Sequence, residues 1–178
     1  AGTNTATVDA GAGNDSIYLA TAINTFDGEI LGGAGDDFLQ NTRVAFQGDR
    51  IGGNEGADTI RLLAGTKTNT FFGGGQGNDS VVLSGTQTDV TISGGKGKDT
   101  INVSGVLTNV TVSGADGHDL MQLTAATGSS TFVITGGKGA DSIRVGTGLY
   151  SSLAGGGLAD TINFLGTVAG GVIYGDSL

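Results

Sequence analysis

The sequence predicts an all-β protein that coils as a parallel β-helix, or β-roll solenoid, of roughly eight turns with about 20 residues per turn. Three observations predict this fold. A Gly-rich motif recurs along the whole chain, aliphatic residues fall into columns at the same spacing, and 36 of the 178 residues are Gly while Pro, Cys and Trp are absent. Repeats of this length are typical of solenoids, in which each unit buries its apolar face by stacking on its neighbours.

The repeated motif is clearest at residues 94–101, where it reads Gly-Gly-x-Gly-x-Asp, followed by a polar and then an aliphatic residue. Successive copies of the motif Asp are separated by 22, 21, 21, 20, 20, 22 and 19 residues. We expect each copy to form a loop at one edge of the solenoid. The motif carboxylates are Asp15, Asp37, Asp58, Asp79, Asp99, Asp119, Asp141 and Asp160.

Apolar residues hold fixed places before and after each motif. Alternate apolar positions indicate strands with one inward face, so we expect two short strands per turn. In the turn that starts at residue 74, these would span 80–84 and 90–93, joined by a turn over 85–89. Asp27, Glu29, Asp49 and Arg50 are expected on the outer face. The column before the loops is Val8, Ile30, Ile51, Phe72, Ile92, Val112, Ile134, Leu153 and Ile173, and the column after them is Ile17, Leu39, Ile60, Val81, Ile101, Met121, Ile143 and Ile162.

Composition excludes several classes of function. A net charge of −9 argues against nucleic-acid binding, which needs clustered Lys and Arg. No apolar run reaches the roughly 18 residues that suggest a membrane-spanning segment, so membrane insertion is not expected. The absence of Cys rules out disulfides and thiolate metal sites, which leaves oxygen ligands for any stabilising metal.

The motif suits Ca²⁺, which takes six to eight oxygen ligands, many of them backbone carbonyls. Gly permits the dihedral angles that direct successive carbonyls inward, and the Asp supplies negative charge. Two stacked loops are needed to surround an ion, so eight loops offer up to seven sites. Besides the motif carboxylates, the predicted metal-site residues are Gly11, Gly13, Gly33, Gly35, Gly75, Gly77, Gly95, Gly97, Gly117, Gly137, Gly139 and Gly156.

The motif resembles the RTX family, whose nonapeptide Gly-Gly-x-Gly-x-Asp-x-aliphatic-x builds a right-handed parallel β-roll that binds Ca²⁺ between turns. The resemblance covers nearly the whole chain and is best at residues 32–39, 74–81, 94–101 and 136–143. Four further copies differ at one or two places. Ala10 replaces the first Gly, Asn54 and Ala115 replace the second, and Leu158 replaces the third.

The chain departs from familiar RTX rolls because its motif occurs once, not twice, per turn. We therefore expect one calcium edge and one metal-free edge built on hydrogen bonds of Thr, Ser and Gly, where the sequence reads Gly-Thr-Lys-Thr, Gly-Thr-Gln-Thr or Gly-Val-Leu-Thr. One Asp per ion predicts weak affinity, on the order of 10⁻⁴–10⁻³ M. Lys96, Lys98, His118 and Lys138 occupy variable loop positions and are expected to face solvent.

These features predict a non-enzymatic, calcium-dependent structural module of a bacterial surface protein, such as an S-layer, adhesin stalk or filament subunit. The resemblance implies export to the cell exterior or surface. We expect residues 1–178 to form one RTX-like repeat domain of a longer array. Its expected partners are further repeats of the same chain, a second copy stacked end to end, or a surface anchor. The alternatives are an ice-binding solenoid with Thr ladders and an accessory region of a secreted enzyme.

Overall fold

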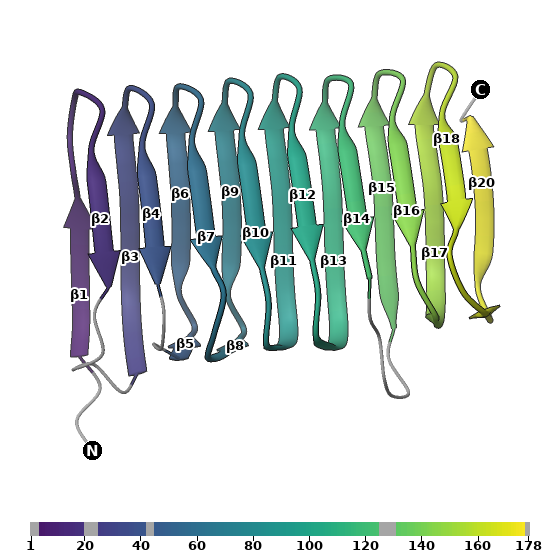
Figure 1. Cartoon of the computed structure of the whole chain (residues 1–178), viewed down its shortest axis with the longest axis horizontal. Helices are drawn as coiled ribbons and strands as arrows, with labels where there is room; N and C mark the ends of the chain where they lie inside the picture. The colour runs from purple at the N-terminus through teal and green to yellow at the C-terminus, as the bar shows by residue number, and fades with distance from the viewer. Residues whose placement is uncertain (1–3, 20–24, 42–44, 125–130, 177–178) are drawn as a thin grey trace.

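The computed structural model describes residues 4–19, 25–41, 45–124 and 131–176. Within these ranges the chain forms strands and no helix, and the strands build two parallel sheets that face each other along the length of a rod (Figure 1). All pairings between strands are parallel, including β11 with β13 and β10 with β12. The predicted solenoid is thereby confirmed, with about seven turns of roughly 20 residues. Among the described residues, no helix is long and apolar enough to cross a membrane.

Among the described residues, the first sheet has twelve strands and the second sheet has eight. The strands of the first sheet are β1 (Asn4–Asp9), β3 (Thr25–Ala34), β5 (Ala45–Gln47), β6 (Arg50–Glu55), β8 (Thr66–Thr68), β9 (Phe71–Gln76), β11 (Thr86–Lys96), β13 (Val106–Asp116), β15 (Phe132–Lys138), β17 (Gly148–Gly157), β19 (Val168–Ala169) and β20 (Val172–Asp176). Those of the second sheet are β2 (Ser16–Leu19), β4 (Phe38–Asn41), β7 (Thr59–Leu62), β10 (Ser80–Leu83), β12 (Thr100–Val103), β14 (Leu120–Leu123), β16 (Ser142–Val145) and β18 (Thr161–Phe164).

One turn of the solenoid, here called a rung, consists of a strand of the first sheet, a motif loop and a strand of the second sheet. In the central rung, β11 leads through the loop that ends at Asp99 into β12. The expected strand over 90–93 is longer than predicted, because residues 86–88 do not form a plain turn. They pair in register with β8 and β13, and the chain bends instead at Asp89, which has a φ of +54°.

The predicted columns lie in the core, stacked residue on residue from rung to rung, together with further buried residues such as Phe46 and Val110. Ile30, Ile51, Phe72 and Ile92 have no exposed surface and follow one another across adjacent strands. Phe46 contacts the ring of Phe72 edge-on, with centroids 6.4 Å apart. Each rung adds only a few inward side chains, such as Val90 and Ile92 from β11 and Ile101 and Val103 from β12. The core is therefore thin, and the loops at the edges matter for stability.

The charged residues of β3 and β6 are only partly placed as predicted. Glu29 and Arg50 lie on the outer face and form an ion pair with a nitrogen–oxygen distance of 3.0 Å. The placement predicted for Asp49 is wrong, because this side chain is buried and accepts hydrogen bonds from the N–H groups of Gly28 and Gln47. Asp49 precedes the outward Arg50, so the strand alternation directs it inward. Burial raises the pKa of Asp49 to about 6.

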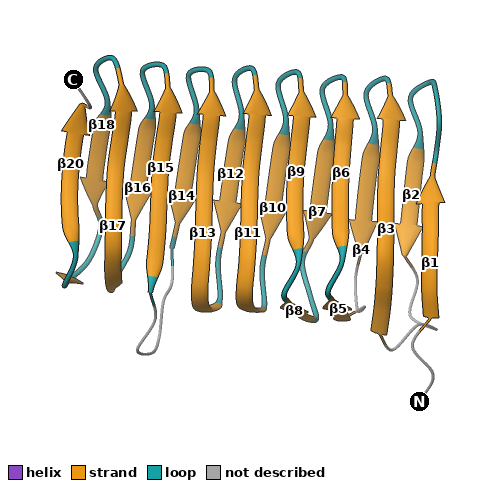
Figure 2. Cartoon of the chain, turned by 180° about the vertical axis from the view of Figure 1, so that it is seen from behind, coloured by secondary structure: helices purple, strands orange, loops and turns teal. Residues whose placement is uncertain are grey.

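The rod has two edges of different character. The motif loops join the first sheet to the second along the upper edge in Figure 1, and we call this the motif edge. The return connections follow the lower edge, here called the opposite edge. The view from behind shows the same arrangement, with β5 and β8 beside the lower turns (Figure 2).

Candidate metal sites along the motif edge

The motif loops owe their shape to two positions at which the backbone is left-handed. At the second motif position φ lies between +79° and +122°, and at the fourth between +71° and +151°. This region costs a residue with a Cβ atom free energy but is open to Gly. All twelve predicted glycines occupy these positions, as does Gly56, which the sequence-based set omitted.

Three loops reach the same conformation without Gly at one of these positions. Asn54 and Ala115 at the second position have φ values of +82° and +79°, and Leu158 at the fourth has +71°. Asn tolerates this region better than other residues, whereas Leu does not. The imperfect copies therefore keep the loop shape at the expense of local strain, most of all at Leu158.

The motif carboxylates form a continuous ladder along the edge. In each of the first seven loops the backbone N–H of the motif Asp donates a hydrogen bond to Oδ1 of the Asp in the following rung. Each of these seven bonds measures 2.8 Å. The ladder links Asp15, Asp37, Asp58, Asp79, Asp99, Asp119, Asp141 and Asp160 in that order.

The second oxygen of each carboxylate, Oδ2, is in a different situation. In all eight motif Asp residues it is buried and has no hydrogen-bond partner. The side chains from Asp37 to Asp141 are almost fully buried, and that of Asp99 is 1% exposed. A buried carboxylate oxygen without a donor is costly. Eight of them in one row indicate that the edge is built to receive positive charge.

The first glycine of the motif provides the seat for this oxygen. In seven of the eight loops, a Cβ atom on that glycine would overlap with Oδ2 of the Asp in the same loop. In four of them it would also collide with the first-position carbonyl oxygen of the next rung, as at Gly94 with the carbonyl of Gly114. The sequence-based set did not include these residues, although the repeated double Gly is visible in the sequence. They are Gly32, Gly53, Gly74, Gly94, Gly114, Gly136 and Gly155.

Burial shifts the protonation equilibria of these carboxyl groups. Desolvation raises the pKa of Asp79 to about 7 and those of Asp58 and Asp119 to about 6. It also raises the pKa of Asp99 and Asp141. Hydrogen bonds from the ladder oppose the shift, and the charge of neighbouring Asp side chains adds to it for Asp58, Asp79, Asp119 and Asp141. A cation among them would relieve both the desolvation and the mutual repulsion.

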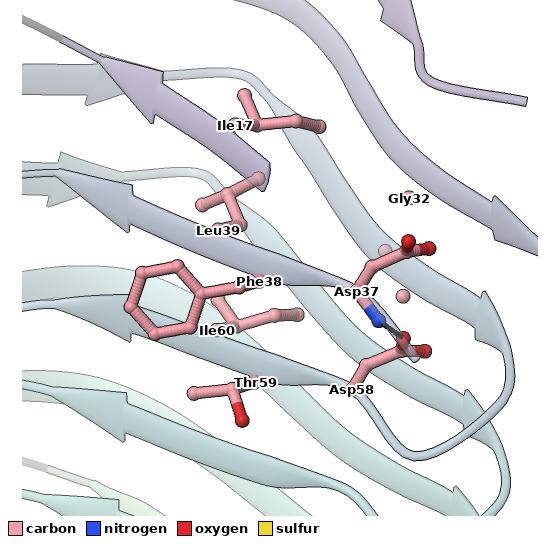
Figure 3. Close-up of a pocket in the computed structure, with 10 residues that line it drawn as sticks. Ile17, Gly32, Asp37, Phe38, Leu39, Asp58, Thr59 and Ile60 are labelled. Carbon is pink, nitrogen blue, oxygen red and sulfur yellow. Dashed lines mark hydrogen bonds between the residues drawn. The ribbon is translucent and has the colours of Figure 1, made fainter. Parts of the chain in front are cut away.

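The donors present fit calcium. Each loop directs one carboxylate oxygen inward, and in four loops the adjacent rung brings a backbone carbonyl oxygen to the same place. Figure 3 shows the side chains of Asp37 and Asp58, joined by the ladder bond, at a cavity of about 10 Å³, which is about the space of one water-sized sphere. Within the described residues no group of three or more His, Asp or Glu side chains gathers around a point. The ligands would thus be one carboxylate per loop with backbone oxygens, a donor set suited to a hard cation.

The variable loop positions face solvent, as predicted. Lys96, Lys98, His118 and Lys138 are exposed, and Lys138 pairs with Asp116 on the loop surface. His118 Nδ1 accepts the backbone N–H of Ala140 at 2.8 Å. This contact gives His118 a structural role between two loops.

Comparison with known protein families agrees with the resemblance found in the repeated motif. A family model described as the RTX calcium-binding nonapeptide repeat matches four copies, at residues 2–21, 23–40, 73–105 and 133–148. Comparisons with curated proteins and with solved structures give no match. The matched segments leave out the loops that contain Asn54, Ala115 and Leu158, yet these loops have the same backbone conformation and continue the same Asp ladder.

Proposed function

Because this chain carries RTX calcium-binding nonapeptide repeats, which imply Ca²⁺ binding, we propose that it is a calcium-rigidified structural module of an extracellular bacterial surface protein. One observation carries the proposal: the unbroken row of eight carboxylates whose buried Oδ2 atoms have no donor. RTX repeat proteins are typically secreted bacterial proteins. Outside the cell millimolar Ca²⁺ would fill sites of the weak affinity expected for one carboxylate per ion.

Calcium would act in this module by neutralising the row and joining adjacent loops. Without it, the stacked carboxylates repel one another, and the thin core must order a chain rich in Gly, which loses the most backbone entropy on folding. With it, each ion would link two rungs at the motif edge. Filling seven sites would bring more positive charge than the net −9 of the chain, so the ions compensate local rather than total charge.

The geometry suits a load-bearing or spacing role. All strands are parallel and stack along one axis, and contacts run from each rung to the next, which makes the module a rod (Figure 1). We propose an S-layer, adhesin stalk or filament subunit, without catalysis by the module itself. His118, the one histidine, is engaged with the backbone of a neighbouring loop.

The partner that best fits the rod is another turn of the same repeat. Edge strands β18 and β20 expose Phe164 and Ile173, which are 43% and 49% accessible and continue the apolar columns of the core. An unpaired apolar strand edge is a template for further parallel pairing. We propose calcium-dependent stacking of a further repeat of this chain or of a second copy. Light scattering and negative-stain microscopy with and without Ca²⁺ test this. Particles that stay monomeric at high protein and calcium concentration would contradict it.

Two alternatives have weaker support. An ice-binding face would need a long ladder of Thr, and Thr68, Thr88 and Thr108 do lie in register. The neighbouring column, however, changes from Thr66 and Thr86 to Val106. Thermal hysteresis in the presence of Ca²⁺ would favour that role. A role as the accessory region of a secreted enzyme would be decided by the sequence that flanks the repeats in the parent protein.

The main proposal is tested by coupling between calcium and folding. Circular dichroism should show little β signal in excess chelator and a cooperative rise as Ca²⁺ enters the millimolar range. Equilibrium dialysis with ⁴⁵Ca²⁺ should then give up to seven ions per chain, whereas Mg²⁺ at the same concentration should not restore the signal. A spectrum and melting temperature that do not change in excess chelator would refute the metal assignment.

A further inference from the structure

The opposite edge contains a buried cation that belongs to the protein itself. Lys67, in β8, has no exposed surface. Its Nζ atom donates hydrogen bonds to the backbone carbonyls of Ala64 at 2.8 Å, Leu62 at 3.2 Å and Gly65 at 3.4 Å, and to the carbonyl of Ser84 in the next rung. Four carbonyl oxygens from two rungs thus converge on one ammonium group.

Among the residues that the structure describes, no carboxylate takes part in this arrangement. Within the described chain the ion pairs are those of Arg50 and Lys138, so the charge of Lys67 is balanced by carbonyl dipoles alone. Burial lowers the pKa of Lys67 to about 8, so the ammonium form still predominates at neutral pH. A cage of backbone oxygens around a cation is what a metal ion would otherwise require.

The surroundings of Lys67 are shaped to this group. Gly85, with a φ of +93°, lies on the cage in the next rung, and a Cβ atom there would press against the Gly65 carbonyl at 2.6 Å and lie 3.7 Å from Lys67 Nζ. Gln87 is the register partner of Lys67 in that rung. Its side chain is fully buried, and both polar atoms of its amide have no hydrogen-bond partner. Lys67 and Gln87 occupy neighbouring places in one column of inward-facing residues, between the apolar Phe46 and Leu107. The polar part of this column is therefore two residues long.

We infer that the opposite edge holds a cation-binding cage of backbone carbonyls and that its resident cation is the ammonium group of Lys67. The two edges therefore obtain their positive charge from different sources. The motif edge buries anions and receives its cations from solution, whereas the opposite edge receives one cation from its own chain. The turn at Leu62–Gly65 and its link to Ser84 should then hold together without a dissolved ion.

The first test compares Lys67→Met with Lys96→Met in saturating Ca²⁺. Lys96 is an exposed loop residue, so its replacement should leave the melting temperature within about 1 °C. Lys67→Met keeps the apolar stem but leaves the carbonyls without their donor, and should lower the melting temperature by about 5–10 °C. Equal melting of the two variants would overturn the inference.

The second test asks whether the cage itself binds an ammonium ion. In Lys67→Ala, n-propylammonium should restore several degrees of the lost melting temperature, whereas tetramethylammonium, which has no N–H donor, should not. Gln87→Leu is the control for general polarity, because removal of an unpaired buried amide should preserve or raise stability. Equal effects of the two ammonium salts on Lys67→Ala would argue against a cage.

A measurement on the unmodified chain remains decisive if the variants fail to fold. The chain has four lysines, and Lys96, Lys98 and Lys138 are exposed. ¹⁵N-detected NMR of the ammonium groups should give one signal whose protons exchange with solvent at least tenfold more slowly than those of the other three. Four lysines with equally fast exchange would refute a buried, carbonyl-bound ammonium.

Discussion

The backbone N–H of Asp79 donates to Oδ1 of Asp99 in the following rung at 2.8 Å, while Oδ2 of the same Asp99 carboxylate is buried without a partner. The two oxygens of one side chain thus serve different purposes. Oδ1 fixes the stacking of the loops, and Oδ2 is left for a cation. Substitutions that keep one oxygen and change the other separate the two roles.

Asp99→Asn should keep the stacking bond and remove the charge. In chelator the variant should fold at least as well as the parent, because a buried charge with a raised pKa has been removed. In millimolar Ca²⁺ it should melt about 4–8 °C lower than the parent, since two adjacent ions lose a ligand. Paired melts by circular dichroism check this. Asp36→Asn, at an exposed loop position, is the control, and an equal loss in chelator and in calcium would contradict the division of roles.

Position along the array should matter for the loss of a carboxylate. Asp99→Ala removes a group shared by rungs on both sides, whereas Asp15→Ala affects the first rung of the ladder. In a stacked array with nearest-neighbour coupling, a substitution in a central rung lowers the stability more than the same substitution in a terminal rung. Calcium-dependent melting of the two variants should therefore show the larger decrease for Asp99→Ala. Equal decreases would mean that the loops do not act as a series.

The raised carboxyl pKa values predict opposite pH responses with and without calcium. Folded Asp79 has a pKa of about 7, and Asp58 and Asp119 have pKa values of about 6, against an ordinary value near 3.8. Between about pH 4 and 7 the folded state thus binds more protons than the unfolded state, so stability rises as the pH falls. In chelator the β signal, which is small at pH 7.5, should therefore increase as the pH falls to 5.

In millimolar Ca²⁺ the trend should reverse, because calcium needs ionised carboxylates and protons displace it. Circular dichroism spectra in chelator and thermal melts in calcium, each at four or five pH values, provide the test. Parallel curves with and without calcium would show that the buried carboxylates are not the metal ligands.

Leu158→Gly should stabilise the last complete loop. Leu158 has a φ of +71° and is 67% exposed, so Gly would remove strain and little buried surface. The gain of about 1 kcal/mol corresponds to a melting temperature about 2–4 °C higher. Leu165→Gly, which is also exposed but has no positive φ, should not raise it. A lower melting temperature for Leu158→Gly would show that the Leu158 side chain stabilises the protein by more than its strained backbone destabilises it.

The repeat made much of this structure predictable. The spacing of the motif Asp residues gave the length of a turn, and the columns that contain Ile92 and Ile101 showed which side chains face inward. Both follow from local chemistry, since Gly-rich loops and alternating apolar residues form the same structure in every rung. The matching backbone at Asn54 and Leu158 shows that the period predicts the loop even where a glycine is missing.

The sequence-based predictions missed residues whose role depends on contacts across rungs. Asp49 was placed outside because charged residues are usually exposed, although the alternation from the inward Ile51 through the outward Arg50 directs it inward. Lys67 was read as part of a polar turn, because a lone Lys among Thr residues is usually solvated. The convergence of four carbonyls on its Nζ arises only when two rungs are stacked. The first-position glycines belong to the same class, since the oxygen that they accommodate comes from a side chain five residues later.

The one-sided placement of the carboxylates has a mechanical consequence. Eight like charges follow one edge at the strand spacing of about 4.8 Å, and the described part of the opposite edge has no matching row. Repulsion between these carboxylates separates adjacent rungs along the motif edge alone. A rod that has lost part of its metal would therefore bend into an arc, with the motif edge on the outer side of the curve. Ions entering the edge would straighten it. Small-angle X-ray scattering across a calcium titration would record this as a change in curvature at constant mass, and a shape that does not vary before unfolding would exclude it.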